Sequence, residues 1–156
     1  MKRGFTLLET ILYIGLFSLL LTSAITVMWQ LVRSMDDNAK HGAVIEEGNF
    51  VMRKINWALT NATIITQPST ATPTTTTLVV TGAGSVHPIT IRFNVASSSV
   101  EMQENNSAFE PLTTNNVRAE NLVFVYTAAV GAVPAGVAAT LTINNTVFQA
   151  ERFIRR

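Results

Sequence analysis

Glu9 is the residue whose chemistry most needs an explanation, because it stands at the head of a long apolar run in this 156-residue chain. The residues that follow it, 10–32, carry no charge, and the next charged residue is Arg33. A carboxylate is costly to bury in hydrocarbon unless it has a charge partner. Two interpretations follow. Either Glu9 is an unpaired charge in a membrane anchor, or it forms an ion pair with a positive group that a single chain lacks.

The chain offers few other residues that could carry out chemistry. His41 and His87 are far apart in the sequence and there are no cysteines, so a zinc site lacks ligands. No Gly-x-Ser-x-Gly sequence supports an esterase-type nucleophile. We therefore predict no catalytic residue and no cofactor, and we expect that the protein is not an enzyme.

Three glutamates in the second half of the chain raise the question of calcium binding. Glu101, Glu104 and Glu110 lie near Asn105 and Asn106 in the sequence, and calcium prefers oxygen ligands of these kinds. Their spacing matches no calcium-binding motif, so a solvated acidic loop is the favoured interpretation. No metal ligand is predicted.

The charge composition gives no reason to expect a nucleic-acid partner. The chain has 11 basic and 10 acidic side chains, a formal net charge of +1, and 13% charged residues. Because there is no cysteine, no disulfide can form, and the fold must be held by packing alone.

The apolar run after Glu9 has the length of a membrane-spanning helix, which needs about 20 apolar residues. Lys2 and Arg3 precede it and favour a cytoplasmic amino terminus, although Arg33 and Lys40 on the other side weaken that argument. A cleavable secretory signal is the alternative, because small residues around position 24 suit signal peptidase. Such signals seldom contain an acid in their apolar region, which argues against it.

The segment RGFTLLE, residues 3–9, resembles the class III signal of type IV pilins and pseudopilins. That resemblance implies cleavage by a prepilin peptidase between Gly4 and Phe5, on the cytoplasmic side, and N-methylation of the new terminal Phe5. Lys2 and Arg3 would supply the charge of a leader peptide, residues 1–4. The family also implies an α+β fold in which a long amino-terminal helix packs on an antiparallel sheet.

Cleavage after Gly4 would give Glu9 the partner that a single chain lacks. The new ammonium group of Phe5 would lie about 6 Å from Glu9 along the helix axis of the same chain. In a staggered bundle of such helices, the ammonium group of one subunit can instead meet Glu9 of a neighbour. A buried charge pair adds little stability but can fix the register of packed helices. We therefore interpret Glu9 as a determinant of assembly.

Helical periodicity continues beyond the apolar run. Apolar residues recur at spacings of three and four from position 44 to position 65, which predicts a helix from about residue 5 to residue 65. Gly42 and Gly48 are its weak points, and two helices with a bend near Gly42 are the alternative. We expect residues 5–33 to form the transmembrane or filament-core helix and residues 34–66 to form an amphipathic helix of a globular domain.

Residues 67–156 are expected to form the antiparallel β part of that domain. The threonine-rich segment 67–77 contains two prolines and predicts a linker or exposed loop. Period-two patterns then predict about six strands, and Asn144–Asn145 predicts a tight hairpin turn. A sheet of this size needs a cover on one face, which the second half of the helix can supply.

The sequence thus favours a filament subunit of a type IV pilus-like or type II secretion system. Segments 53–65 and 109–126 loosely resemble minor pilins and J-class minor pseudopilins, and the first helix lacks the proline of many major pilins. The partners implied are prepilin peptidase, other pilin or pseudopilin subunits through the amino-terminal helix, the inner-membrane assembly machinery and, before assembly, membrane lipid. No nucleic acid is evident.

The resemblance also implies where the protein resides. Before assembly it would cross the cytoplasmic (inner) membrane once, with its carboxyl-terminal domain outside the cytoplasm, and afterwards it would belong to a cell-surface or periplasmic filament. The alternative from another class is a membrane-anchored binding module or adhesin outside the cytoplasm that never polymerises. Such a module needs the anchor but has no use for Glu9.

Overall fold

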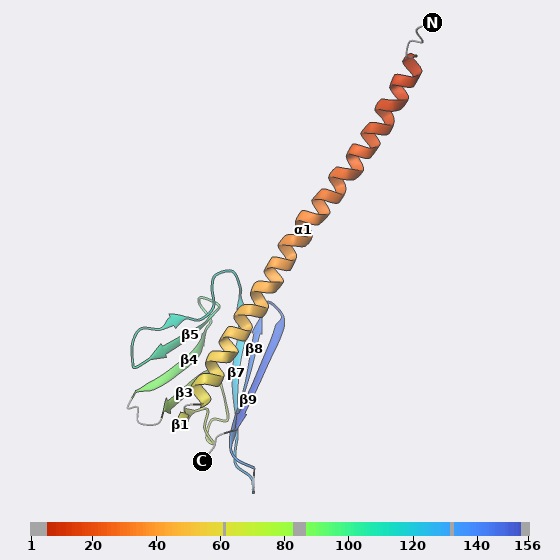
Figure 1. Cartoon of the computed structure of the whole chain (residues 1–156). Helices are drawn as coiled ribbons and strands as arrows, with labels where there is room; N and C mark the ends of the chain where they lie inside the picture. The colour runs from red at the N-terminus through yellow and green to blue at the C-terminus, as the bar shows by residue number, and fades with distance from the viewer. Residues whose placement is uncertain (1–5, 61, 83–86, 132, 154–156) are drawn as a thin grey trace. The chain divides into compact units, whose positions relative to one another are not determined.

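The protein has an α+β fold in which one helix is followed by antiparallel strands, as predicted (Figure 1). The computed structural model describes residues 6–60, 62–82, 87–131 and 133–153. The helix α1 extends over Leu7–Thr60 and is uninterrupted at Gly42 and Gly48. The chain divides into two compact units, Met1–His41 and Gly42–Arg156, which are described separately below.

In the second unit, the strands of the described ranges form two antiparallel sheets and not the single sheet that the sequence predicts. The first sheet has the order β1-β3-β4-β5-β6 and contains β1 (Ala62–Gln67), β3 (Thr77–Gly82), β4 (Pro88–Asn94), β5 (Ser99–Glu104) and β6 (Glu110–Pro111). The second sheet has the order β2-β7-β8-β9 and contains β2 (Thr74–Thr75), β7 (Ala119–Thr127), β8 (Gly136–Ile143) and β9 (Thr146–Phe153).

The hairpin of β8 and β9 forms as the sequence predicts. Alternate residues of β8 are buried, because a strand presents successive side chains to opposite faces. Asn144 and Asn145 have φ angles of 45° and 63°, which asparagine tolerates better than most residues, and they form the predicted turn.

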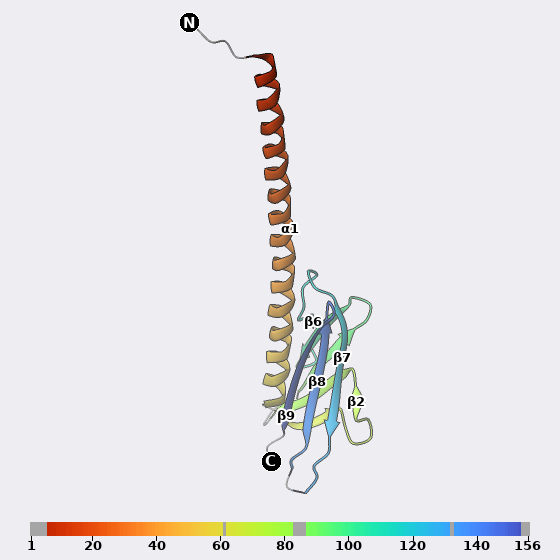
Figure 2. The same ribbon diagram turned by 90° about the vertical axis from the view of Figure 1, so that its right-hand side faces the viewer.

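The hydrophobic core lies between the two sheets and the part of α1 from Gly42 onward, which runs along them (Figure 2). From the helix, Val51 and Ile55 are fully buried; from the sheets, Leu78, Ile91 and Phe124 are fully buried. Complete burial of such a side chain contributes roughly 1.5–3 kcal/mol. The apolar residues whose spacing predicted an amphipathic helix are therefore the residues of α1 that pack against the sheets.

The predicted end of the helix at Ile65 is wrong, because α1 ends at Thr60 and Ala62–Gln67 is strand β1. Ala62 and Ile65 both pack against the core although they are three residues apart. The register of β1 against β3 shifts between Ala62 and Ile64 and again between Ile65 and Gln67. Such irregularities change which residues face inward, so a bulged strand reproduced the spacing of a helix.

The segment 67–77 is only partly the loop that its composition predicts. Pro68 is fully buried, and Thr74–Thr75 forms β2, which pairs with residues 124–125 of β7. This pairing joins segments about 50 positions apart, and local composition carries no signal for it. The tetrapeptide 82–85, predicted as a hairpin turn, lies mostly outside the described residues, but β3 and β4 pair antiparallel on either side of it.

Candidate functional site

The candidate site begins in the first turn of α1, at Glu9. The backbone N–H of Glu9 donates to the carbonyl oxygen of Thr6 at 3.1 Å and contacts the Thr6 hydroxyl oxygen at 3.4 Å. Thr6 therefore caps the helix, and Glu9 stands three residues later, which is the Thr-x-x-Glu spacing of a capping box. The Glu9 side chain is half-buried.

This local role for Glu9 is one that the sequence reasoning missed. The signal was present, because a threonine three residues before a glutamate at the start of an apolar run is a helix-start pattern. An acid in the first turn is also favoured by the positive end of the helix dipole. Helix initiation therefore accounts for part of the position of Glu9, independently of any partner subunit.

The other residues of the predicted processing site lie outside the described residues. These are Lys2, Arg3, Gly4 and Phe5. The predicted cleavage, methylation and leader charge stay predictions that depend on the sequence alone.

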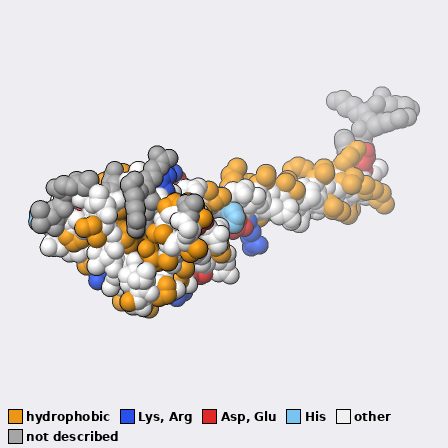
Figure 3. All heavy atoms as spheres, turned by 90° about the horizontal axis from the view of Figure 1, so that it is seen from below, with side chains coloured by type: hydrophobic (Ala, Val, Ile, Leu, Met, Phe, Trp, Pro, Cys, Tyr) orange, Lys and Arg blue, Asp and Glu red, His pale blue; other side chains and the backbone are white. Residues whose placement is uncertain are grey.

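The described part of the first unit contains one helical stretch long and apolar enough to cross a membrane. Its large apolar side chains are exposed, from Leu7, which is 78% exposed, to Val32, which is 51% exposed. Figure 3 shows these hydrophobic side chains along the helix. In the described part of the chain this apolar surface is uncovered, as it is on a helix that could cross a membrane.

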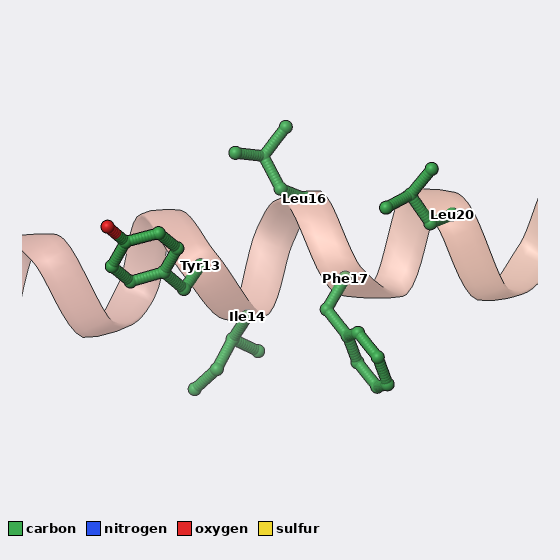
Figure 4. Close-up of a pocket in the computed structure, with 5 residues that line it drawn as sticks. All are labelled: Tyr13, Ile14, Leu16, Phe17 and Leu20. Carbon is green, nitrogen blue, oxygen red and sulfur yellow. The ribbon is translucent and has the colours of Figure 1, made fainter.

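The bulky side chains of this stretch surround the helix and leave open grooves between them. Figure 4 shows one such groove, where Leu16 and Leu20 project from one side of the helix and Ile14 and Phe17 from another; Tyr13 completes the lining. The groove is lined almost entirely by carbon, which suits an acyl chain or an apolar helix and not a polar ligand.

A band of hydroxyl side chains interrupts the bulky residues. The hydroxyls of Ser18, Thr22, Ser23 and Thr26 donate to backbone carbonyl oxygens of the preceding turn at 2.8–2.9 Å. Each hydroxyl is therefore satisfied within the helix and does not need water. What the band presents outward is small side chains, which permit another helix to approach closely in a membrane.

Charged residues return at the end of the apolar stretch. The Lys40 ammonium donates to an Asp36 carboxylate oxygen at 2.6 Å, one helical turn away. This hydrogen bond, together with the charge of Asp36, raises the pKa of Lys40 above its ordinary 10.5. Both side chains are exposed, so the pair contributes little stability. The Lys40–Asp36 pair therefore lies where the apolar surface ends, and we assign no binding role to it.

The acidic residues of the second unit are not arranged as a calcium site. Glu101 accepts two hydrogen bonds from the Arg92 guanidinium group at 3.0 and 3.1 Å and one from the Asn94 amide at 2.7 Å. Its carboxylate is thus occupied by side chains on the neighbouring strand. Within the described ranges, no group of three or more histidine or acidic side chains could hold a metal ion.

Comparison with known proteins adds no further assignment. No protein-family model matches the chain, and no curated protein or solved structure matches it either. The resemblance to pilins therefore depends on residues 3–9 and on the helix that follows them.

Proposed function

We propose that the protein is a subunit of a type IV pilus-like or type II secretion filament. In this proposal it is made as a precursor in the inner membrane, cleaved after Gly4 by prepilin peptidase, and assembled with other subunits through α1. A minor pilin or pseudopilin is the form that the sequence favours, and the β domain would then lie outside the cytoplasm.

The observation that carries the proposal is the combination of Glu9 with the exposed apolar surface that follows it. An isolated anchor needs only the apolar surface. A carboxylate at its head, next to a predicted cleavage site that creates a new ammonium group, supplies a charge pair that can set the register of packed helices. The hydroxyl band supports the same proposal, because its small side chains permit close helix contact.

A second candidate function is favoured by the cap at Thr6. Because an acid in the first turn is favoured by the helix dipole and has the Thr-x-x-Glu spacing, a membrane-anchored binding module that never polymerises would also carry Glu9 at this position. The two proposals differ in what happens to the chain after insertion. A filament subunit leaves the membrane as part of a polymer, whereas a binding module stays in the bilayer.

The experiment that tests the proposal locates the mature chain and its amino terminus. Filaments sheared from producing cells should contain the protein, and mass spectrometry should find Phe5, methylated, as its first residue. Recovery only from membranes, with the same terminus, would favour the binding module. A terminus near Ile25 would contradict the pilin-like processing and indicate an ordinary secretory signal.

A further inference from the structure

The side of α1 that faces away from the sheets carries a second surface, within the unit Gly42–Arg156. Phe50 and Trp57 are two turns apart on this side and remain 37% and 44% exposed. The Lys54 ammonium lies between them, 5.9 Å from the centre of the Phe50 ring and 5.5 Å from the Trp57 ring. With Arg53, these residues line a shallow groove, here called the basic aromatic face.

The basic aromatic face has no acidic partner within the described part of its own chain. The ion pairs found there are Lys40 with Asp36 and Arg92 with Glu101, and neither includes Arg53 or Lys54. One acid shares the face, since Glu46 is exposed one turn before Phe50. Arg53 and Lys54 are thus two adjacent cations outside the ion pairs of the described residues, and they suit a partner that offers carboxylates.

The chain itself carries a surface of that chemistry at the far edge of the first sheet. Glu110 pairs with Met102 across β5 and β6, and Glu104 is two positions from Met102 along β5. Residues two apart on a strand share a face, so Glu104 and Glu110 are diagonal neighbours on one face of this sheet edge. Both are exposed, and neither belongs to an ion pair of the described residues.

We propose that the basic aromatic face of one subunit binds the Glu104–Glu110 edge of a second copy of this chain. The two surfaces belong to different parts of the unit, so the contact is heterologous, and repetition of such a contact builds an open helical assembly and not a closed dimer. The contact is too small to hold two domains together alone, because stable interfaces bury about 1,200–2,000 Å². It acts on subunits already brought together by α1, where the effective concentration is high.

This inference rests on the proposed filament function and makes it more specific, since a self-contact requires consecutive copies of the chain and so favours a repeating subunit over a minor one. The absence of native cysteines permits a direct test in the full chain, made in cells with their assembly machinery. Arg53→Cys combined with Glu110→Cys should give a disulfide-linked ladder when filaments are oxidised. Arg53→Cys combined with Glu151→Cys, an exposed glutamate on β9, is the matched control and should give none.

A charge-exchange series provides a second measurement that does not depend on disulfide geometry. Replacing Arg53 and Lys54 by glutamate should reduce recovery in the filament fraction by about tenfold or more, because like charges across a contact repel strongly. Adding Glu104→Lys and Glu110→Lys should restore recovery to within about twofold of the wild type, since opposite charges again face each other. Membrane levels of each variant show whether it folds.

The outcomes separate this inference from the proposed function. Wild-type filaments without the ladder, or with cross-links only to a different subunit, would overturn the self-contact and leave the filament function standing. Failure of the four-residue exchange to restore recovery, with membrane levels normal, would also overturn it. Absence of the wild-type chain from filaments would overturn both.

Discussion

The ring of Phe148 on β9 occupies the space that a side chain on Gly48 of α1 would need. A Cβ atom at Gly48 would overlap the Cζ, Cε1 and Cε2 atoms of that ring. The glycine is therefore required by packing and not by backbone conformation, and it brings the helix close to the second sheet. At Gly42, by contrast, a Cβ atom would meet nothing within 4 Å.

We predict that Gly48→Ala destabilises the domain by about 1–3 kcal/mol, because the Phe148 ring must move out of a packed position. Gly42→Ala is the matched control and should stabilise the protein by about 0.5–1 kcal/mol, since alanine is the better helix former. Urea unfolding of both variants measures the difference. Equal effects of the two substitutions would contradict the packing role of Gly48, and Phe148→Leu should relieve most of the cost of Gly48→Ala.

A second prediction concerns Glu47, which joins α1 to the loop between β6 and β7. One Glu47 carboxylate oxygen accepts from the Thr114 backbone N–H at 2.8 Å, and the other accepts from the Thr114 hydroxyl. Glu47→Ala should cost about 1–2 kcal/mol, because hydrogen bonds to a charged group contribute about that much when partly exposed. The exposed neighbour Glu46 is the control, and Glu46→Ala should change stability by less than about 0.5 kcal/mol.

Amide exchange in the same loop can distinguish the local effect of Glu47→Ala from a general loss of helix stability. Thr114 lies next to Thr113, whose buried hydroxyl accepts from the Val100 backbone N–H on β5. Amide exchange at residues 113–117 should therefore accelerate in Glu47→Ala more than exchange within α1. Uniform acceleration across the domain would show that Glu47 does not anchor the loop.

Much of the fold could be predicted from the sequence where local pattern and final structure agree. Strands β7, β8 and β9 follow from short runs rich in β-branched and aromatic residues and from an asparagine pair at the turn. Strand β1 could not be predicted, because its bulges gave it a helix-like spacing. The two-residue strand β2 forms only through pairing with the distant strand β7, and β6, equally short, pairs with the preceding strand β5. The division into two sheets likewise has no local sequence signal.

Of the functional surfaces, only the position of Glu9 could be predicted from the sequence. Glu9 stood out because a charge at the head of an apolar run is costly and rare. The cap at Thr6 is a contact of the Glu9 backbone N–H, so it is a property of the first turn that the cost of a buried carboxylate does not predict. The basic aromatic face could not be predicted, because no sequence signal places Lys54 between the rings of Phe50 and Trp57.

A third prediction is that residues 34–156 alone form a soluble, monomeric α+β domain. The compact unit begins at Gly42, and its core contains residues of α1 and of both sheets. Circular dichroism should therefore show helix and strand together, with a cooperative thermal transition, and sedimentation should give a monomer. Removing residues 34–60 as well should abolish folding, because the sheets would lose the helix that covers their core. A folded fragment without the helix would contradict this account.

The final prediction separates the two roles of Glu9, assembly and helix capping. Glutamine can replace glutamate in a capping box, whereas leucine cannot. Glu9→Gln therefore removes the charge and keeps a side chain that can complete a capping box, whereas Glu9→Leu removes both. The backbone N–H of residue 9 still meets Thr6 in either variant. Neither change should hinder insertion, because an acid at mid-helix costs about 2.5–3.5 kcal/mol on translocon scales, and a neutral residue lowers that cost.

If Glu9 pairs with the Phe5 ammonium group of a neighbour, both variants should reach normal membrane levels, be cleaved normally, and be nearly absent from sheared filaments. The loss of one member of a buried pair costs about 3–5 kcal/mol, which is enough to exclude a subunit. Thr6→Ala is the control, because it removes the cap but leaves the carboxylate, and it should still enter filaments once its cleavage is verified. Normal assembly of Glu9→Gln alongside failure of Glu9→Leu and Thr6→Ala would show that Glu9 acts through the helix cap and that no charge pair sets the register.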